Sequence, residues 1–102
     1  MQAIMAIRRS DIQFENAEVR VTRWDLEPGA STGVHLHAYD YVVVPVVDGT
    51  MEVALTDGHQ SISILNVGSS YFRPRGATHD ARNVGEALLS FVEVELIHVA
   101  TQ

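Results

Sequence analysis

The chain has 102 residues, of which 46% are hydrophobic and 20% charged, enough for one domain with a buried core and too hydrophobic for a disordered protein. It contains no cysteine, and all seven basic residues are arginine, which excludes disulfides, thiolate metal sites, cysteine nucleophiles, lysine Schiff bases and a P-loop. The net charge of −6 argues against nucleic acid or an anionic membrane as a partner, because both bind basic surfaces.

Membrane insertion and secretion are not indicated either. No apolar run approaches the roughly 18 residues of a membrane span. The N-terminal apolar residues precede Arg8 and Arg9, whereas a secretory signal carries its positive charge first. We therefore expect a cytoplasmic protein.

Short strands separated by turns dominate the pattern, and no long stretch has a clean helical period with caps. The expected strands cover residues 18–26, 33–37, 39–47, 50–56, 59–65, 70–73, 77–82 and 88–97. Asp48-Gly49 and Asp57-Gly58 lie between such strands, and Asp-Gly pairs are typical of hairpins. The whole chain, residues 1–102, is thus expected to be one antiparallel sandwich or barrel. Residues 1–10 would form an arm or an added edge strand.

Two strands carry further information about position. Pro45 interrupts the valine-rich strand, which indicates a sheet edge or a bulge there. The last strand alternates, with Phe91, Glu93 and Glu95 on one face. Three aromatic residues are expected in the core: Trp24, Phe72 and Phe91.

Three of the five histidines stand in a pattern that suits a metal ion. His35 and His37 are two apart, so on a strand they point to the same face, with roots about 6–7 Å apart. His79 follows the Pro74-Arg75-Gly76 turn and would supply a third imidazole from a neighbouring strand. The alternative is that these are surface histidines of a strand and a turn. His59 and His98 are expected to be surface or structural residues.

The spacing of these histidines and of several glycines resembles the two motifs of the cupin family. The first motif, residues 29–49, is matched by Gly29, His35, His37 and Gly49. The second, residues 68–83, is matched at every position, by Gly68, Pro74, Gly76, His79 and Asn83. Within that RmlC-like superfamily, the stretch 21–45 resembles small bacterial cupins assigned to β-alanine degradation.

One motif position departs from the family. Cupins usually supply a glutamate as a fourth ligand, and the spacing places Val42 or Tyr41 there, with Asp40 the nearest acid. Asp40 could be a ligand or could orient a ligand histidine. If Val42 faces the metal, three neutral imidazoles leave a divalent ion its full charge, which favours an anionic, chelating substrate.

The resemblance implies an all-β jelly-roll barrel, the double-stranded β-helix, with one divalent metal ion (Fe, Zn, Ni or Mn) on His35, His37 and His79. It also implies a metal-dependent enzyme, dioxygenase-like, acting on a small organic acid. Two alternatives stay open: a non-catalytic cupin that binds a small molecule for sensing or storage, and a metal-assisted isomerase or lyase. Because small cupins commonly pair through edge strands, we expect a homodimer.

Three residues near the expected metal are candidates for catalytic roles: Asp40, Tyr41 and Arg73. A tyrosine hydroxyl can donate to a bound substrate, although strand tyrosines more often pack. Arg73, like Arg75, flanks the Pro-x-Gly turn and could hold a substrate carboxylate with its planar fork. Either arginine could equally pair with the acidic surface. For isomerase or lyase chemistry the sequence offers only Asp40, Tyr41 or a free histidine as an acid or base.

Overall fold

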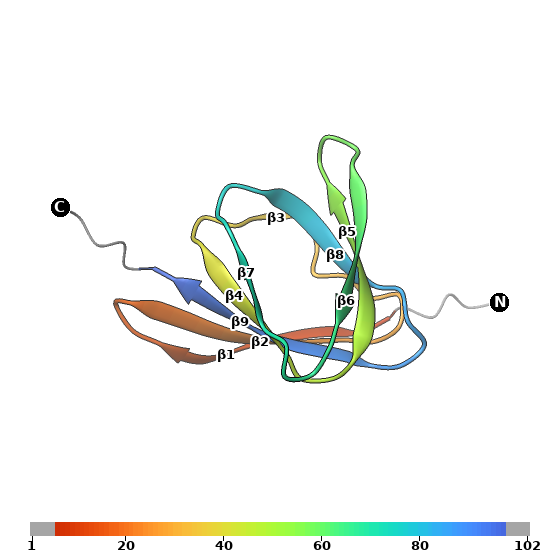
Figure 1. Cartoon of the computed structure of the whole chain (residues 1–102), viewed down its shortest axis with the longest axis horizontal. Coiled ribbons are helices and arrows are strands. Elements are labelled where there is room, and N and C mark those ends of the chain that lie inside the picture. The colour runs from red at the N-terminus through yellow and green to blue at the C-terminus, as the bar shows by residue number, and fades with distance from the viewer. Residues whose placement is uncertain (1–5, 98–102) are drawn as a thin grey trace.

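The computed structural model describes residues 6–97, and in that range the regular structure consists of nine strands (Figure 1). In chain order the strands are β1 (Arg8–Glu15), β2 (Val19–Leu26), β3 (His35–Leu36), β4 (Tyr41–Pro45), β5 (Gly49–Leu55), β6 (Gln60–Leu65), β7 (Tyr71–Arg73), β8 (Thr78–Asn83) and β9 (Leu89–Leu96). The all-β fold expected from the sequence is confirmed. Over the same range no helix has the length and apolarity needed to cross a membrane.

The strands form two antiparallel sheets that face each other. One sheet has the order β1-β2-β9-β4-β7 and the other the order β3-β8-β5-β6. Strands that are neighbours in a sheet are mostly distant in sequence, as in a jelly roll. The core lies between the sheets, and its largest fully buried apolar side chains are Phe91, Leu26, Leu65 and Leu89.

Only one of the two Asp-Gly signals marks a hairpin. Asp57-Gly58 joins the paired strands β5 and β6, and Gly58 has a φ of +96° that favours glycine. Asp48-Gly49 instead carries the chain from one sheet to the other, because β4 and β5 lie in different sheets. Gly49 is needed for close packing: a Cβ there would come within 2.5 Å of the Leu89 Cδ1.

The N-terminal region contains a strand that the sequence indicated only in outline. β1 pairs with β2 and forms one edge of the larger sheet, so Arg8–Ser10 lie in an edge strand. Residues 1–5 lie outside the described part. All of β1 is exposed, including Ile12 and Phe14, and the β1–β2 hairpin extends past the other sheet (Figure 1). A homodimer through this edge stays a prediction.

Phe72 and Pro45, in the larger sheet, test where the sequence analysis placed individual residues. Phe72 was expected in the core, but its side chain is 56% exposed, because it pairs with Val42 on the outer face of the sheet. Pro45 is buried at the end of β4, beyond the three residues that pair with β7. The missing proline N–H therefore faces no ladder on that side.

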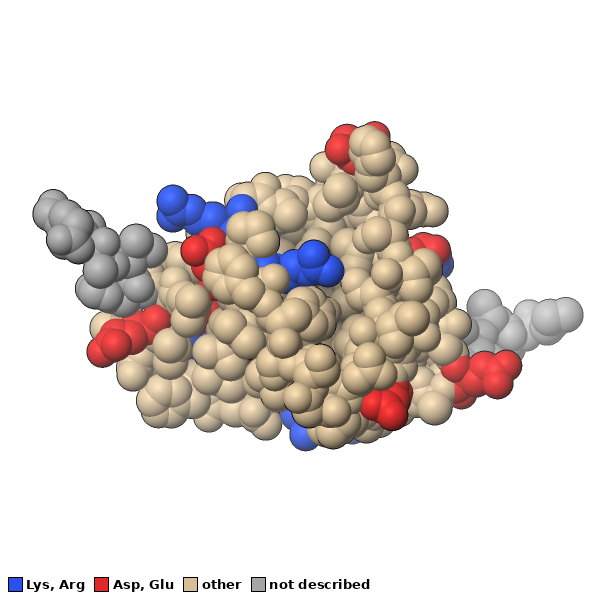
Figure 2. All heavy atoms as spheres, viewed as in Figure 1, with Lys and Arg blue, Asp and Glu red and all other residues tan. Residues whose placement is uncertain are grey.

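Figure 2 shows acidic and basic side chains scattered over the face in view, most of which is uncharged.

Candidate metal centre

Strand pairing places the first and third histidines opposite each other. β3 pairs with β8 so that His35 lies across from His79, and directly opposed residues have Cβ atoms about 5 Å apart. His37 follows β3, and its backbone bonds to Ala77 and Gly76 continue the pairing. Gly76, at a φ of +105°, makes the turn that brings β8 alongside.

The His35 ring is held in one tautomer by the turn before it. His35 Nδ1 lies 2.7 Å from the carbonyl oxygen of Gly33, and because a carbonyl can only accept, Nδ1 carries the proton. The lone pair is then on Nε2, which faces the other two histidines. Such a carbonyl partner is a common way of orienting a metal-ligating histidine.

The three Nε2 atoms converge on one point. His37 Nε2 lies 2.9 Å from both His35 Nε2 and His79 Nε2, and the three donor atoms are within 4.8 Å of one another. Nitrogens bound at 2.0–2.1 Å and at right angles around one ion would be about 2.9 Å apart. The donor set therefore fits a divalent ion held on one face, and the three predicted ligands come together.

Burial lowers the pKa of His37 and His79 and keeps these two imidazoles neutral, which is the form that binds a metal. Desolvation, with the nearby His35 and His79 adding to it, lowers the pKa of His37 to about 3. Desolvation also lowers the pKa of His79 to about 4, with His35 and Arg73 contributing. Glu93 Oε2 lies 4.0 Å from His37 Nε2, but with a neutral imidazole this contact is not an ion pair.

The buried histidines predict that the metal-free protein is sensitive to acid. The unfolded chain takes up protons near pH 6.5, whereas the folded state holds His37 and His79 neutral down to about pH 3–4. Between these values the unfolded state binds more protons, so the free energy of unfolding falls as pH falls. Glu93 acts in the opposite direction, because its pKa is raised to about 7 and the folded state takes up that proton first. From pH 7 to pH 4.5 we therefore expect a net loss of roughly 2 kcal/mol, at about 1.4 kcal/mol per pKa unit.

Urea denaturation of the metal-free protein at both pH values measures this loss. His37→Leu should make the dependence shallower, whereas His59→Ala should leave it unchanged, because His59 is an exposed turn residue beside Asp57. Equal acid sensitivity of wild type and His37→Leu would contradict the explanation.

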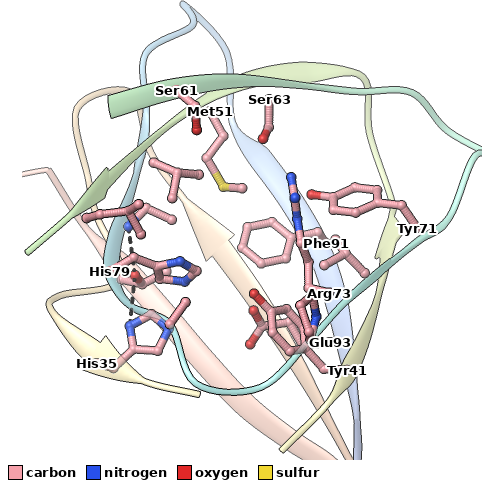
Figure 3. Close-up of a pocket in the computed structure, with 17 residues that line it drawn as sticks. His35, Tyr41, Met51, Ser61, Ser63, Tyr71, Arg73, His79, Phe91 and Glu93 are labelled. Atoms are coloured by element: carbon pink, nitrogen blue, oxygen red, sulfur yellow. Dashed lines mark hydrogen bonds between the residues drawn. The ribbon is translucent and has the colours of Figure 1, made fainter. Parts of the chain in front are cut away.

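A cavity of about 240 Å³ opens beside the histidines. Figure 3 shows His35 and His79 pointing into it from one side, with Tyr41, Arg73 and Glu93 across from them. Much of the remaining wall is apolar and includes Met51 and Phe91. A space of this size suits a small molecule and lies below the range usual for drug-sized ligands.

Tyr41, and not Val42, faces this cavity. β4 alternates, with Tyr41 and Val43 buried and Val42 partly exposed on the other face. The Tyr41 ring stacks on His37 with centroids 3.9 Å apart. Burial raises the pKa of Tyr41, with Glu93 adding to the effect, so its hydroxyl stays protonated at neutral pH. The motif position counted to Val42 therefore contributes nothing to the centre.

The other two predicted catalytic residues have different surroundings. Asp40 Oδ1 accepts a hydrogen bond of 2.8 Å from the backbone N–H of Arg75, so Asp40 ties the turn before β8 to the start of β4 and is not part of the cavity wall. Arg73 lines the cavity, with its guanidinium carbon 5.1 Å from the centroid of the Tyr71 ring. Arg75 is absent from the wall.

The structure adds a carboxylate that the sequence reasoning missed. Glu93 on β9 lines the cavity with its side chain only 12% exposed, and its Oε1 accepts a 3.0 Å hydrogen bond from Trp24 Nε1. Burial raises its pKa to about 7, with Trp24 opposing the rise. The expectation that only Asp40, Tyr41 or a free histidine could serve as an acid or base was therefore wrong. The alternation of β9, which puts Glu93 on the face of Phe91, was the available signal.

Comparison with known proteins agrees with this architecture. Residues 22–95 match the family described as "Cupin domain". The chain belongs to the cupin family. Over 85 residues, 83% of this cupin, it is 42% identical to "Beta-alanine degradation protein BauB" of Pseudomonas aeruginosa, of which the match covers 88%.

Solved structures give the same assignment. A cupin domain from Bordetella pertussis superposes with a TM-score of 0.82 at 38% identity, covering 94% of this chain and 97% of that one. An RmlC-like cupin with a double-stranded β-helix fold from Methanocaldococcus jannaschii gives a TM-score of 0.74 at 14% identity, covering 94% and 85%. The second likeness concerns the fold alone.

Proposed function

We propose that this cupin is a metal-dependent enzyme of the oxygenase type that acts on a small organic acid. The observation that carries the proposal is the convergence of three imidazoles beside a cavity that His35 and His79 line. His35, His37 and His79 would hold the ion from one side and leave its other positions facing the cavity. When bound, a divalent ion supplies Lewis acidity and, if it is iron, the redox chemistry that O₂ requires.

The protein's own residues would place the substrate. Arg73 lies across the cavity from the histidines, where its planar fork can hold a carboxylate. The Tyr41 hydroxyl stays protonated and can donate to the substrate, while Met51 and Phe91 exclude water. A relative named for β-alanine degradation supports a small carboxylic acid as the substrate class.

Oxygen uptake tests this function directly. Protein loaded with Fe(II) should consume O₂ when small oxo or hydroxy acids are added, and metal-free protein or His35→Ala should not. Arg73→Ala should raise KM for these acids about tenfold or more, since it removes a charge-assisted bond, and should leave metal content unchanged.

The alternatives predict different results. If no acid causes O₂ uptake, but one raises the melting temperature of zinc-loaded protein, the cupin is a binding module or a redox-neutral enzyme. Absence of O₂ uptake with every acid tested would contradict the oxygenase proposal. An unchanged KM in Arg73→Ala would remove that residue from the substrate site.

A further inference from the structure

The two carboxylate oxygens of Glu93 have different surroundings. Oε1 accepts the indole N–H of Trp24 at 3.0 Å, and the Trp24 ring lies roughly parallel to His35, with centroids 6.4 Å apart. Oε2 points towards the histidines, 4.0 Å from His37 Nε2, and receives no hydrogen bond from any group in residues 6–97. The Glu93 side chain is only 12% exposed and lines the cavity, so a donor to Oε2 can enter from the cavity side.

Glu93 lies beside the metal-ligand set and not in it. The donor atoms within 4.8 Å of one another belong to the three histidines alone among the described residues. Trp24 holds the other oxygen, Oε1, at 3.0 Å, so Oε2 is left on the side of the histidines and the cavity.

We propose that Glu93 selects a substrate that carries a hydroxyl or enol group as well as a carboxylate. The inference rests on the proposed function. The O–H group donates to Glu93 Oε2 beside the histidines, and the carboxylate of the same molecule pairs with Arg73 on the cavity wall. Trp24 is a positioning residue that holds Glu93 Oε1. The substrate class is therefore a small hydroxy acid, or an oxo acid in its enol form.

Two matched probes isolate the hydroxyl: lactate carries it, and propionate is the same acid without it. Their binding to zinc-loaded protein at pH 8 is measured by calorimetry, in wild type and in Glu93→Gln. Wild type should prefer lactate. In Glu93→Gln the amide oxygen can still accept from Trp24, but an NH₂ group replaces the acceptor at the ligand side. The lactate-to-propionate preference should therefore fall about tenfold or more, because hydrogen bonds to charged acceptors are the strong ones.

Two further variants and one measurement separate the possible outcomes. Glu95→Gln, two residues along β9 and paired with Arg20, should leave the preference unchanged, and Trp24→Phe should reduce it in part. Zinc content by elemental analysis should stay equal in wild type and Glu93→Gln. An unchanged preference in Glu93→Gln would overturn the proposal, as would loss of zinc, which would make Glu93 a ligand. Absence of zinc from wild type would instead overturn the metal centre itself.

Discussion

Replacing His79 with alanine is expected to lower the affinity for a divalent ion by more than about a hundredfold. His79 supplies one of three converging nitrogens, and its Nε2 lies 2.9 Å from that of His37. Removing even an outer hydrogen-bond partner of a ligand commonly costs 10–100-fold, so loss of a ligand should cost more. Wild type should contain about one ion per chain after loading and dialysis, and His79→Ala close to none. Elemental analysis and calorimetric titration with Zn²⁺ measure both quantities.

The matched control is His59→Ala. His59 lies in the β5–β6 turn with its side chain 80% exposed, and its contact is with Asp57. This variant should keep wild-type stoichiometry and affinity. If His79→Ala retains its metal, the three imidazoles do not form the binding site, whatever their distances in the metal-free protein.

Replacing Asn83 with alanine should lower the free energy of unfolding by roughly 2–3 kcal/mol. The Asn83 side chain is fully buried, and its amide donates to the carbonyl oxygens of Leu26 and Ala87, both at 2.8 Å. Its Oδ1 accepts from the Gly85 N–H at 2.9 Å. Alanine would leave the buried carbonyl oxygen of Leu26 without this donor, at about 1–3 kcal/mol. The groups of Ala87 and Gly85 are exposed or half-buried and can bond to water, so they add less.

A loss of this size is a large share of the roughly 5–15 kcal/mol that stabilises a domain. Urea denaturation measures it, with Asn66→Ala as the control, because Asn66 lies exposed in the turn between β6 and β7. The control should change stability by less than about 0.5 kcal/mol. Equal effects of the two substitutions would show that the motif asparagine has no structural role.

The sequence predicted that His35, His37 and His79 come together because much of that signal is local. His35 and His37 share a face by the strand period alone, and the turn at Gly76 sets the position of His79. Similarly, the two-residue spacing within β9 could place Glu93 on the inner face. That spacing could not show that Trp24 on β2 lies beside Glu93. The contact depends on the pairing of β2 with β9, and the two residues are 69 positions apart in the sequence.

The two wrong predictions, a hairpin at Asp48-Gly49 and a buried Phe72, also concern features that depend on long-range pairing. Asp48-Gly49 has the composition of a hairpin, but the next strand, β5, pairs with β6 and β8 in the other sheet. Phe72 is apolar and lies in a strand, yet the register with Val42 puts it on the outer face. Composition indicated that both segments were strands or turns, and only the long-range pairing determined which side each residue faces.

β3 is only two residues long, and it carries the first histidine of the centre. So short a ladder gives little resistance to local opening. An ion bound to His35 and His79 would be a cross-link between segments more than forty positions apart, and it would restrict the unfolded chain as well as the open native state. Binding of the ion and local opening of β3 at this end of the barrel are then linked. A ligand that strengthens metal retention would also suppress the opening of β3.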